Sequence, residues 1–594
     1  MDNKIYEDFS GLQRRSQIVF LIVEFLFLAL AFYYWKVQIL DHRKYWALSE
    51  ANRIREVILQ APRGLLTDRT GKVILADNKA SFKTSIIRED CRDYEESCEK
   101  ISRLLGLEKA VLQNRIDKYK SLPLFKPIVV KDNLTVDEVA QIEARKLDLP
   151  ELVIEAEPKR YYPFANLAAH IIGYMQEVSP EELRTKYKDR RLGDLVGKTG
   201  IEAQYESILA GTEGKVIEVV DSQGRVREEI SRIKPKQNQK LILTLDFDLQ
   251  KKAEELLEGK EGAVVVMEAK TGEILALASY PTYDPNKFIN RFTPEEWLDL
   301  VSRPDHPLEN RTIRGLYSPG SIFKLVMALG ALEFGWITAE TTFFCGGSIE
   351  IYGHPFSCWQ EGGHGSLNLY EGIRNSCNIY FYNLGRRMGI DEIARAAYLL
   401  GLGTGTEIDL PGEKEGLVPS PEWKRKTRKA AWYPGETISV AIGQGPLLVT
   451  PLQIASLTAI IANRGIKVFP HLLKSWIETA GKREMVKIQR SFFENVIEGM
   501  WRSVNAGGTG RAARIEGFDV CGKTGSTQTI SSEKAKKLAV QKREIKTHSW
   551  FTGLAPRDDP QIVVTVLVEY GGMGGETAAP LARRLFELYK SKYD

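Results

Sequence analysis

A serine and a lysine stand three positions apart in the stretch Tyr317-Ser-Pro-Gly-Ser-Ile-Phe-Lys324. On a helix this spacing puts Ser321 and Lys324 on one face, with about 5–6 Å between their Cβ atoms. The apolar run 325–332 predicts that this helix is buried. A buried lysine can be neutral at pH 7 and accept the proton of a serine hydroxyl, which makes the serine a nucleophile. Taken alone, the spacing also fits a capping serine beside a solvated lysine.

Two motifs further along the chain favour the nucleophile. Ser376-Cys377-Asn378 follows the serine–lysine stretch, and Lys523-Thr524-Gly525 lies near the C-terminus. The order Ser-x-x-Lys, Ser-x-Asn, Lys-Thr-Gly is typical of penicillin-binding transpeptidases and serine β-lactamases. With the rest of the chain included, the sequence resembles a class B penicillin-binding protein of the elongation-specific penicillin-binding protein 2 subfamily. The resemblance covers nearly the whole chain.

The resemblance implies a role for each residue of the predicted catalytic group. Ser321 would attack the carbonyl of a D-Ala-D-Ala stem peptide and form an acyl-enzyme. Lys324 would be the base, and Ser376 would relay a proton to the leaving D-alanine. Asn378 would hold the substrate amide, and Lys523 would supply positive charge. A second stem peptide would then attack the acyl-enzyme and form a cross-link, while β-lactams would acylate the same serine.

The residues that follow Lys523 are expected to bind substrate. Thr524 would hydrogen-bond the terminal carboxylate, and Gly525 completes the Lys-Thr-Gly motif. The backbone N–H groups of Ser321 and Ser526 would form the oxyanion hole.

Three cysteines and a histidine lie in one short segment around the Ser-x-Asn motif: Cys345, Cys358, His364 and Cys377. Three thiolates and an imidazole suit tetrahedral zinc. Some penicillin-binding protein 2 members resemble this sequence in having a metal site here, built from Asp, Asp, His and Cys. Cysteine in place of aspartate keeps the ligand count and favours zinc. The alternatives are a Cys345–Cys358 disulfide or buried free thiols.

A second Lys-Thr-Gly occurs at Lys198-Thr199-Gly200. The residues after this copy have a helical pattern, whereas 518–521, before Lys523, can form a strand. Because the resemblance requires the motif on a strand that edges the cleft, the 523 copy is assigned to catalysis and the 198 copy to a structural turn.

The elements that would position these motifs belong to an α+β fold. From residue 241 to 594 the sequence predicts strands at both ends, with helices between them. The predicted strands are 242–246, the two strands of the hairpin 263–278, and the runs 548–554 and 562–570. The resemblance implies a transpeptidase domain here, on an extended pedestal at 36–240. Within the pedestal, residues 96–118 have the pattern of an amphipathic helix. The stretch 533–546 is expected to be a charged loop beside the cleft.

The N-terminal region predicts a membrane anchor. Residues 18–35 are apolar and follow a polar tail at 1–17. Basic residues flank the run on both sides, so charge does not settle its orientation. The resemblance implies a single-pass protein of the bacterial cytoplasmic (inner) membrane, with the catalytic domain outside the cytoplasm.

Composition excludes few functions. Lys and Arg total 82 and Asp and Glu total 78, which gives no signal for nucleic-acid binding. The resemblance implies a cell-wall transpeptidase that takes peptidoglycan stem peptides on lipid II-derived glycan. Its partner would be a membrane glycosyltransferase of the shape, elongation, division and sporulation family. A D,D-carboxypeptidase, a β-lactamase or a non-catalytic β-lactam sensor shares the motifs but seldom has this pedestal and anchor.

Overall fold

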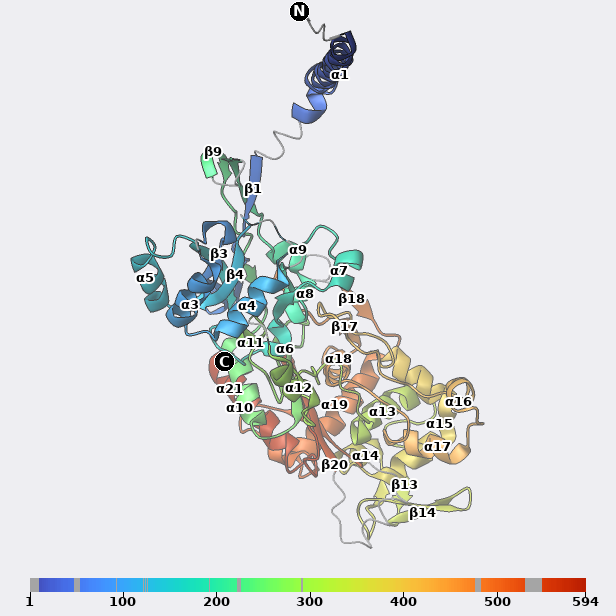
Figure 1. Ribbon diagram of the computed structural model, residues 1–594. Coiled ribbons are helices and arrows are strands. Elements are labelled where there is room, and N and C mark those ends of the chain that lie inside the picture. Colours follow the sequence, from blue (N-terminus) through green and yellow to red (C-terminus); the bar gives the residue numbers. More distant parts are fainter. Residues whose placement is uncertain are drawn as a thin grey trace, which may run out of the picture. The chain divides into compact units, whose positions relative to one another are not determined.

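The computed structural model describes most of the chain, and the expected loop at 533–546 lies outside the described residues. The described residues are 10–46, 54–91, 93–120, 122, 124, 126–191, 193–221, 226–289, 292–475, 482–528 and 547–593. The chain forms two compact units, each made of several segments (Figure 1). The first unit comprises 1–62, 80–158 and 211–237, and the second comprises 63–79, 159–210 and 238–594. Two segments of the expected pedestal, 63–79 and 159–210, thus share a compact unit with the C-terminal segment.

The N-terminal apolar run forms one long helix. Helix α1 (Ser10–Trp35) continues into the π-helical turn η1 (Lys36–Leu40). Within the described part of the chain, Arg14–Leu40 is the one helix long and apolar enough to cross a membrane, and its apolar window is fully exposed. An exposed apolar surface of this length needs a lipid environment or a partner to cover it.

The rest of the first unit combines short helices with antiparallel strands. Strand β8 pairs with β1 on one side and β9 on the other, while β3 pairs with β4 and β5. The predicted helix at 96–118 is two helices, because Gly106 adopts a left-handed conformation and ends the first one. The elements of this unit are β1 (Ile54–Leu59), β3 (Ile74–Ile86, which begins in the second unit), η2 (Arg88–Asp90), α3 (Tyr94–Leu105), α4 (Lys109–Lys118), β4 (Ile128–Leu134), α5 (Val136–Ala144), β5 (Leu152–Tyr161), β8 (Gly214–Val220) and β9 (Val226–Ile233).

The early segments of the second unit are joined by a buried ion cluster. Glu202 is fully buried and accepts hydrogen bonds from Arg63 Nε at 2.5 Å and Arg160 Nε at 2.7 Å. A buried carboxylate is stable only when it is paired in this way. The elements of these segments are β2 (Leu66–Thr67), α6 (Ala169–Ile172), β6 (Met175–Glu177), α7 (Pro180–Thr185), β7 (Leu195–Gly197), α8 (Gly200–Gln204) and α9 (Glu206–Leu209).

A five-stranded antiparallel sheet with the order β12-β11-β21-β20-β19 forms the centre of the second unit. Its strands are β11 (Gly262–Glu268), β12 (Ile274–Tyr280), β19 (Cys521–Gln528), β20 (Thr547–Ala555) and β21 (Ile562–Val568). The predicted hairpin and the two predicted C-terminal strands are confirmed. The predicted strand at 242–246 is wrong beyond β10 (Leu241–Ile242), because the Asp246 carboxylate accepts from the first backbone N–H groups of α10 (Phe247–Leu257) and caps that helix.

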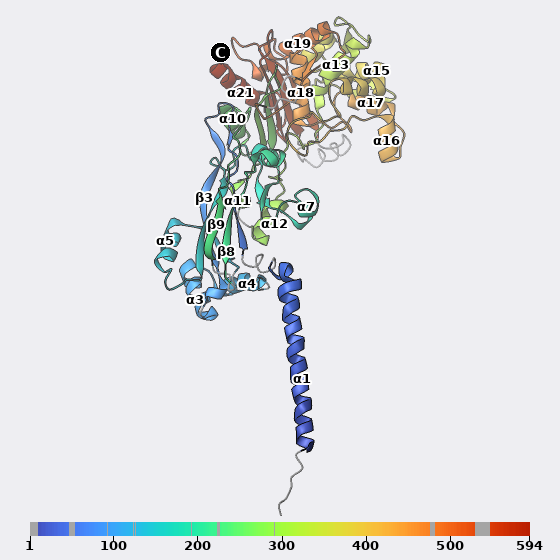
Figure 2. The same cartoon turned by 90° about the horizontal axis from the view of Figure 1, so that it is seen from above.

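Both faces of the central sheet are buried. Along β11, Val265 and Met267 belong to one hydrophobic core, and Val264 and Val266 belong to the other. Successive side chains of a strand point to opposite faces, so an uninterrupted apolar strand requires helices on both sides. Helices α10 and α21 (Ala578–Tyr593) cover one face, and α18 (Pro451–Ala462) and α19 (Arg490–Asn505) cover the other (Figure 2). Helix α13 (Lys324–Glu333) packs on α19.

The helical layer that carries the predicted motifs lies between β12 and β19 in the sequence. Its helices are α11 (Asn286–Ile289), α12 (Pro294–Ser302), η3 (Gly320–Phe323), α13 (Lys324–Glu333), α14 (Leu369–Arg374), α15 (Asn378–Leu399), α16 (Pro421–Arg428), α17 (Pro434–Val440), α18 (Pro451–Ala462), α19 (Arg490–Asn505) and η4 (Arg511–Ala513). Its short strands are β13 (Phe343–Cys345), β14 (Ser348–Ile351), β15 (His354–Ser357), β16 (Gly365–Leu367), β17 (Ile466–Val468) and β18 (Arg483–Met485).

Candidate active site

Ser321 lies in a tight 3-10 turn, η3, that runs directly into α13 at Lys324. Gly320 has φ +54°, and a Cβ there would lie 2.5 Å from Thr527 Cγ2 on β19. Only glycine therefore fits where the serine turn meets the strand. Within the described residues the Ser321 hydroxyl has no hydrogen-bond partner, which leaves it available to a substrate.

Lys324 is fully buried and points at the Ser-x-Asn motif. Its Nζ donates to Ser376 O at 2.8 Å, to Asn378 Oδ1 at 2.7 Å and to Ser376 Oγ at 3.3 Å. Burial lowers the pKa of Lys324 to about 7, and negative charge at the nearby Cys377 and Cys358 sulfurs partly opposes this effect. A substantial neutral fraction near pH 7 is what a general base requires.

Lys523, on β19, reaches the same hydroxyl. Its Nζ donates to Ser376 Oγ at 2.8 Å and to Thr524 O at 2.9 Å, and its side chain is fully buried. Burial, and next the charge of Lys324, hold the pKa of Lys523 well below its ordinary value. Two ammonium groups that share one hydroxyl repel each other, so an anion bound beside Lys523 would favour its protonated form.

Ser376 is held in an unusual backbone conformation between α14 and α15. Its φ is +52°, in the left-handed region that residues other than glycine rarely adopt. Its backbone N–H donates to Ile373 O, and the next N–H, of Cys377, donates to Gly372 O. Strain of this kind is found at functional sites, where the surrounding structure maintains it.

The Lys-Thr-Gly motif at 523–525 lies on β19, the edge strand of the central sheet. Thr524 Oγ1 donates to Thr509 Oγ1 at 2.8 Å, and Ser526 Oγ accepts from Gly574 N at 3.0 Å. Thr509 was missed by the sequence analysis. The run Gly507-Gly-Thr-Gly510 is the signal that could have identified it, because glycines around a single threonine indicate a backbone that closely approaches a site.

The other Lys-Thr-Gly copy lies between β7 and α8. Lys198 forms an ion pair with Glu182 and does not contact the Ser376 cluster. The structure therefore brings Lys324, Ser376, Asn378 and Lys523 together, with Ser321 in the turn before Lys324. The chemical roles of these residues, and of Thr524, Gly525 and Ser526, stay predictions.

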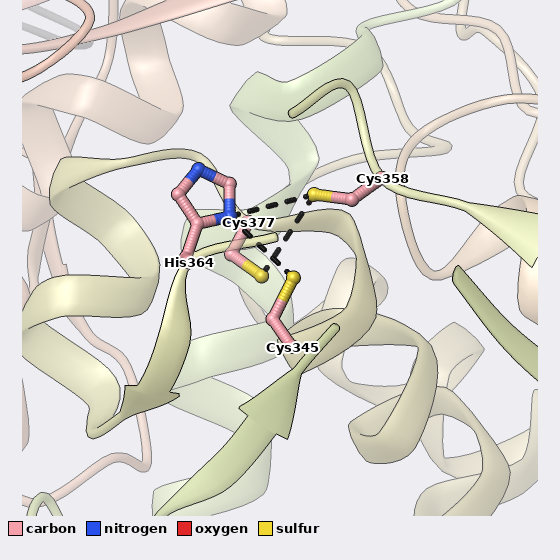
Figure 3. Close-up of side chains that lie close together, drawn as sticks. All are labelled: Cys345, Cys358, His364 and Cys377. Atoms are coloured by element: carbon pink, nitrogen blue, oxygen red, sulfur yellow. Dashed lines mark hydrogen bonds between the residues drawn. The ribbon is translucent and has the colours of Figure 1, made fainter. Parts of the chain in front are cut away.

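The three cysteines and the histidine converge on one point (Figure 3). The potential ligand atoms of Cys345, Cys358, His364 and Cys377 all lie within 4.8 Å of one another. His364 Nδ1 lies 3.5 Å from Cys345 Sγ and 3.6 Å from Cys358 Sγ, and Cys358 Sγ lies 4.0 Å from Cys377 Sγ. All six cysteines of the chain are free, so the structure has no Cys345–Cys358 disulfide.

The fold and the site define the class of protein as a penicillin-binding transpeptidase, and comparison with known proteins agrees. Residues 262–587 match the penicillin binding protein transpeptidase domain, and residues 58–243 match the penicillin-binding protein dimerisation domain. Peptidoglycan D,D-transpeptidase MrdA of Acinetobacter baumannii is 36% identical to this chain, with 97% of this chain and 87% of the relative covered. The chain belongs to the penicillin-binding protein 2 family of peptidoglycan D,D-transpeptidases.

Two solved structures extend the comparison. Penicillin-binding protein 2 of Helicobacter pylori in complex with MreC has a TM-score of 0.81 and 31% identity, with 91% of this chain and 99% of that chain covered. The second is a chain from a study of the structural coordination of polymerization and crosslinking by a peptidoglycan synthase complex. It has a TM-score of 0.72 and 30% identity, with 98% of this chain and 99% of that chain covered. Both likenesses extend over the N-terminal and C-terminal parts of the chain.

Proposed function

We propose that this chain cross-links peptidoglycan stem peptides through an acyl-enzyme on Ser321. The observation that carries the proposal is the sharing of one hydroxyl, Ser376 Oγ, by the buried amines of Lys324 and Lys523. The arrangement connects a base beside the nucleophile to a proton donor beside the leaving group. A β-lactam sensor would need only the base beside the nucleophile, and not the proton donor beside the leaving group.

The proposed reaction proceeds in two transfers. Neutral Lys324 accepts the Ser321 proton as Oγ attacks the penultimate D-alanine carbonyl, and backbone N–H groups of Ser321 and Ser526 stabilise the oxyanion. The C–N bond then breaks, and the proton passes from Lys324 through Ser376 Oγ to the nitrogen of the leaving D-alanine. The amine of a second stem peptide then attacks the ester carbonyl and forms the C–N bond of the cross-link. The C–O bond to Ser321 breaks, and the proton lost by the amine passes to Ser321 Oγ.

The test of the proposed function is cross-linking itself. Full-length protein, reconstituted in membranes with a glycosyltransferase and supplied with lipid II, should give cross-linked dimers of stem peptides on chromatographic analysis of digested glycan. Release of D-alanine without dimers would favour the carboxypeptidase alternative. Stable acylation by penicillin with neither product would favour the sensor alternative.

The two Lys-Thr-Gly copies should differ in their effect on acylation. Lys523→Ala should slow acylation by penicillin by at least about tenfold, the equivalent of about 1.4 kcal/mol of transition-state stabilisation. The reason is that Lys523 donates to Ser376 Oγ, and we expect its positive charge to attract the β-lactam carboxylate. The measurement is the rate of covalent labelling by fluorescent penicillin.

Lys198→Ala is the matched control for this comparison. Lys198 belongs to the same tripeptide but is paired with Glu182 away from the cluster, so labelling should be nearly unchanged. Equal slowing in both variants would show that the wrong copy has been assigned.

We also propose that Cys345, Cys358, His364 and Cys377 hold one structural zinc ion. A tetrahedral site with bonds of about 2.3 Å to sulfur and about 2.0–2.1 Å to nitrogen places sulfurs about 3.8 Å apart, and sulfur and nitrogen about 3.6 Å apart. Three contacts in the cluster, of 3.5, 3.6 and 4.0 Å, are close to these separations, and all four ligand atoms lie within 4.8 Å of one another. Because Cys377 stands between Ser376 and Asn378, four metal bonds would maintain the strained catalytic loop.

Zinc content, stability and acylation should respond together to one ligand substitution. Cys358→Ser should lose about one zinc per chain, lower the melting temperature and slow labelling by penicillin, because the loop with Ser376 would lose its restraint. Elemental analysis, thermal unfolding and labelling kinetics measure the three effects. Cys98→Ser, a buried cysteine in the other compact unit, should keep its zinc.

The zinc proposal has a defined alternative. Protein purified without chelator that contains no zinc, and that shows a Cys345–Cys358 disulfide by mass spectrometry, would replace the metal site with the disulfide.

The membrane context is proposed from the anchor and the relatives. Helix α1 fits a single-pass anchor, and we place it in the bacterial inner membrane with the catalytic domain outside the cytoplasm. The likeness to a chain of a peptidoglycan synthase complex supports a glycosyltransferase of the shape, elongation, division and sporulation family as the partner. The likeness to a structure in complex with MreC supports a second protein partner.

A further inference from the structure

One carboxylate connects the central sheet to the segment that leads into Ser321. Glu569 directly follows β21, and its side chain is 13% exposed. Its Oε1 atom accepts hydrogen bonds from Arg311 Nε and from Tyr317 Oη, each at 2.7 Å. The two donors stand ten and four residues before Ser321. The proposed function gives this largely buried network no role.

Arg311 fixes the position of the Glu569 carboxylate. The Arg311 side chain is only 4% exposed, and its terminal nitrogens donate to Asp305 O at 2.8 Å and to His306 O and Glu261 Oε2, both at 3.3 Å. The backbone N–H of Glu569 also donates to Glu261 O at 2.7 Å. Because a guanidinium is planar and is held here by several acceptors, it supports the carboxylate rigidly.

The ring of Tyr317 connects this carboxylate to the serine turn. Its centroid lies 5.6 Å from that of His548 and 6.1 Å from that of Trp550, and both pairs meet edge to face. Trp550 Nε1 in turn donates to Ser318 O at 3.2 Å. Ring contacts are individually weak, whereas a hydroxyl that donates to a carboxylate makes a strong, directional bond. The Tyr317 hydroxyl therefore determines where the ring lies against Trp550, and with it the position of the Ser318 carbonyl.

The serine turn lies in close contact with β19. A Cβ at Gly525 would lie only 3.0 Å from Pro319 O. The backbone N–H groups of Ser321 and Ser526, one from each side of this contact, are expected to form the oxyanion hole. A displacement of the turn along β19 would therefore change the separation of the two donors and the position of Ser321 Oγ.

We propose that Glu569 is a positioning residue for acylation, which acts through Tyr317 to fix the turn that presents Ser321. The inference rests on the proposed function, because that function makes Ser321 the nucleophile. The network does not need to touch the substrate to have this effect. A misplacement of about 1 Å can slow a reaction about 10²-fold, even when it arises from a contact far from the chemistry.

The experiment compares three substitutions in the full-length protein. Tyr317→Phe removes only the hydroxyl that donates to Glu569. Glu569→Gln keeps Oε1, the atom that accepts from both Tyr317 and Arg311. Tyr205→Phe is the matched control, because Tyr205 Oη donates to Asp409 Oδ2, also at 2.7 Å, in the same compact unit. The readouts are the limiting rate of acylation by fluorescent penicillin, the penicillin concentration at half-saturation, and the melting temperature.

Tyr317→Phe should lower the limiting rate of acylation about tenfold and leave the half-saturating concentration unchanged, because it displaces the nucleophile and not the ligand. Glu569→Gln should lower the melting temperature, because Arg311 loses a counter-charge, yet acylate within about twofold of the unmodified protein. Tyr205→Phe should lower the melting temperature about as much as Tyr317→Phe and leave the limiting rate unchanged. A purely structural contact would not separate rate from stability in this way.

Two outcomes would overturn the role of Glu569. One is an unchanged limiting rate in Tyr317→Phe, and the other is a slowing that follows the loss of melting temperature in all three variants. Mass spectrometry of the labelled peptide keeps this test apart from that of the proposed function. Label on a residue other than Ser321 in the unmodified protein would overturn both proposals, whereas label on Ser321 at an equal rate in Tyr317→Phe would overturn only the role of Glu569.

Discussion

Replacing Ser321 by alanine is expected to abolish covalent labelling by penicillin. Ser321 lies at the start of a buried helix, one turn before Lys324, and its hydroxyl has no competing partner within the described residues. Removal of the nucleophile leaves nothing to form the ester, and losses on the order of 10⁶-fold are typical of such changes. Fluorescent penicillin, followed by gel and by mass spectrometry of the labelled peptide, measures the effect.

Ser302→Ala serves as the control for labelling. Ser302 is exposed at the end of α12, so its loss should change neither labelling nor thermal stability. The melting temperature of Ser321→Ala should also stay close to that of the unmodified protein, because alanine fills the start of a helical turn well. Stoichiometric labelling of Ser321→Ala would contradict the assignment of the nucleophile.

Removing the amine of Lys324 should have the second largest effect. Lys324→Met keeps a long, unbranched side chain but has no base, and loss of a general base typically slows a reaction by about 10²- to 10⁴-fold. The buried amine donates to Ser376 O and Asn378 Oδ1, so the variant also loses the contacts that orient the Ser-x-Asn motif. The measurement is the rate of acylation at saturating penicillin.

A second variant separates the role of Lys324 as a base from its role as a structural contact. Lys324→Arg keeps hydrogen-bond donors and positive charge, but its guanidinium does not accept a proton near neutral pH. It should therefore be nearly as slow as Lys324→Met. Acylation that survives in Lys324→Arg would show that Lys324 acts through its charge.

The pH profile of the unmodified protein gives the same test without a substitution. Since burial lowers the pKa of Lys324 to about 7, the neutral amine becomes dominant above that pH. Acylation should therefore rise with pH through about 7 and then level off. A rate that falls over this interval would mean that the protonated amine is the active form.

Local patterns in the sequence were enough to predict much of the chemistry and the fold. The spacing of Ser321 and Lys324 encodes a shared helical face, and the apolar run at 18–35 encodes a helix that is exposed in the structure. The uninterrupted apolar strands around Val264 and Val566 encode a sheet buried on both faces. These features could be predicted because the period of a helix or a strand decides which nearby side chains share one face, and therefore one environment.

Only the tertiary structure decided which distant residues meet. Two Lys-Thr-Gly copies have the same composition, but only Lys523 contacts Ser376, which lies 147 residues away. No comparable sequence pattern predicts the contact of Thr509 with Thr524. The same holds for the division of the chain into two discontinuous units. These features depend on how the sheet and helices pack, which places β19 against the serine turn and closes the loop that carries Cys377. The sequence by itself determined the reactive groups. Packing brought both lysines to the Ser376 hydroxyl, and their buried amines are stable there because each has hydrogen-bond acceptors within reach.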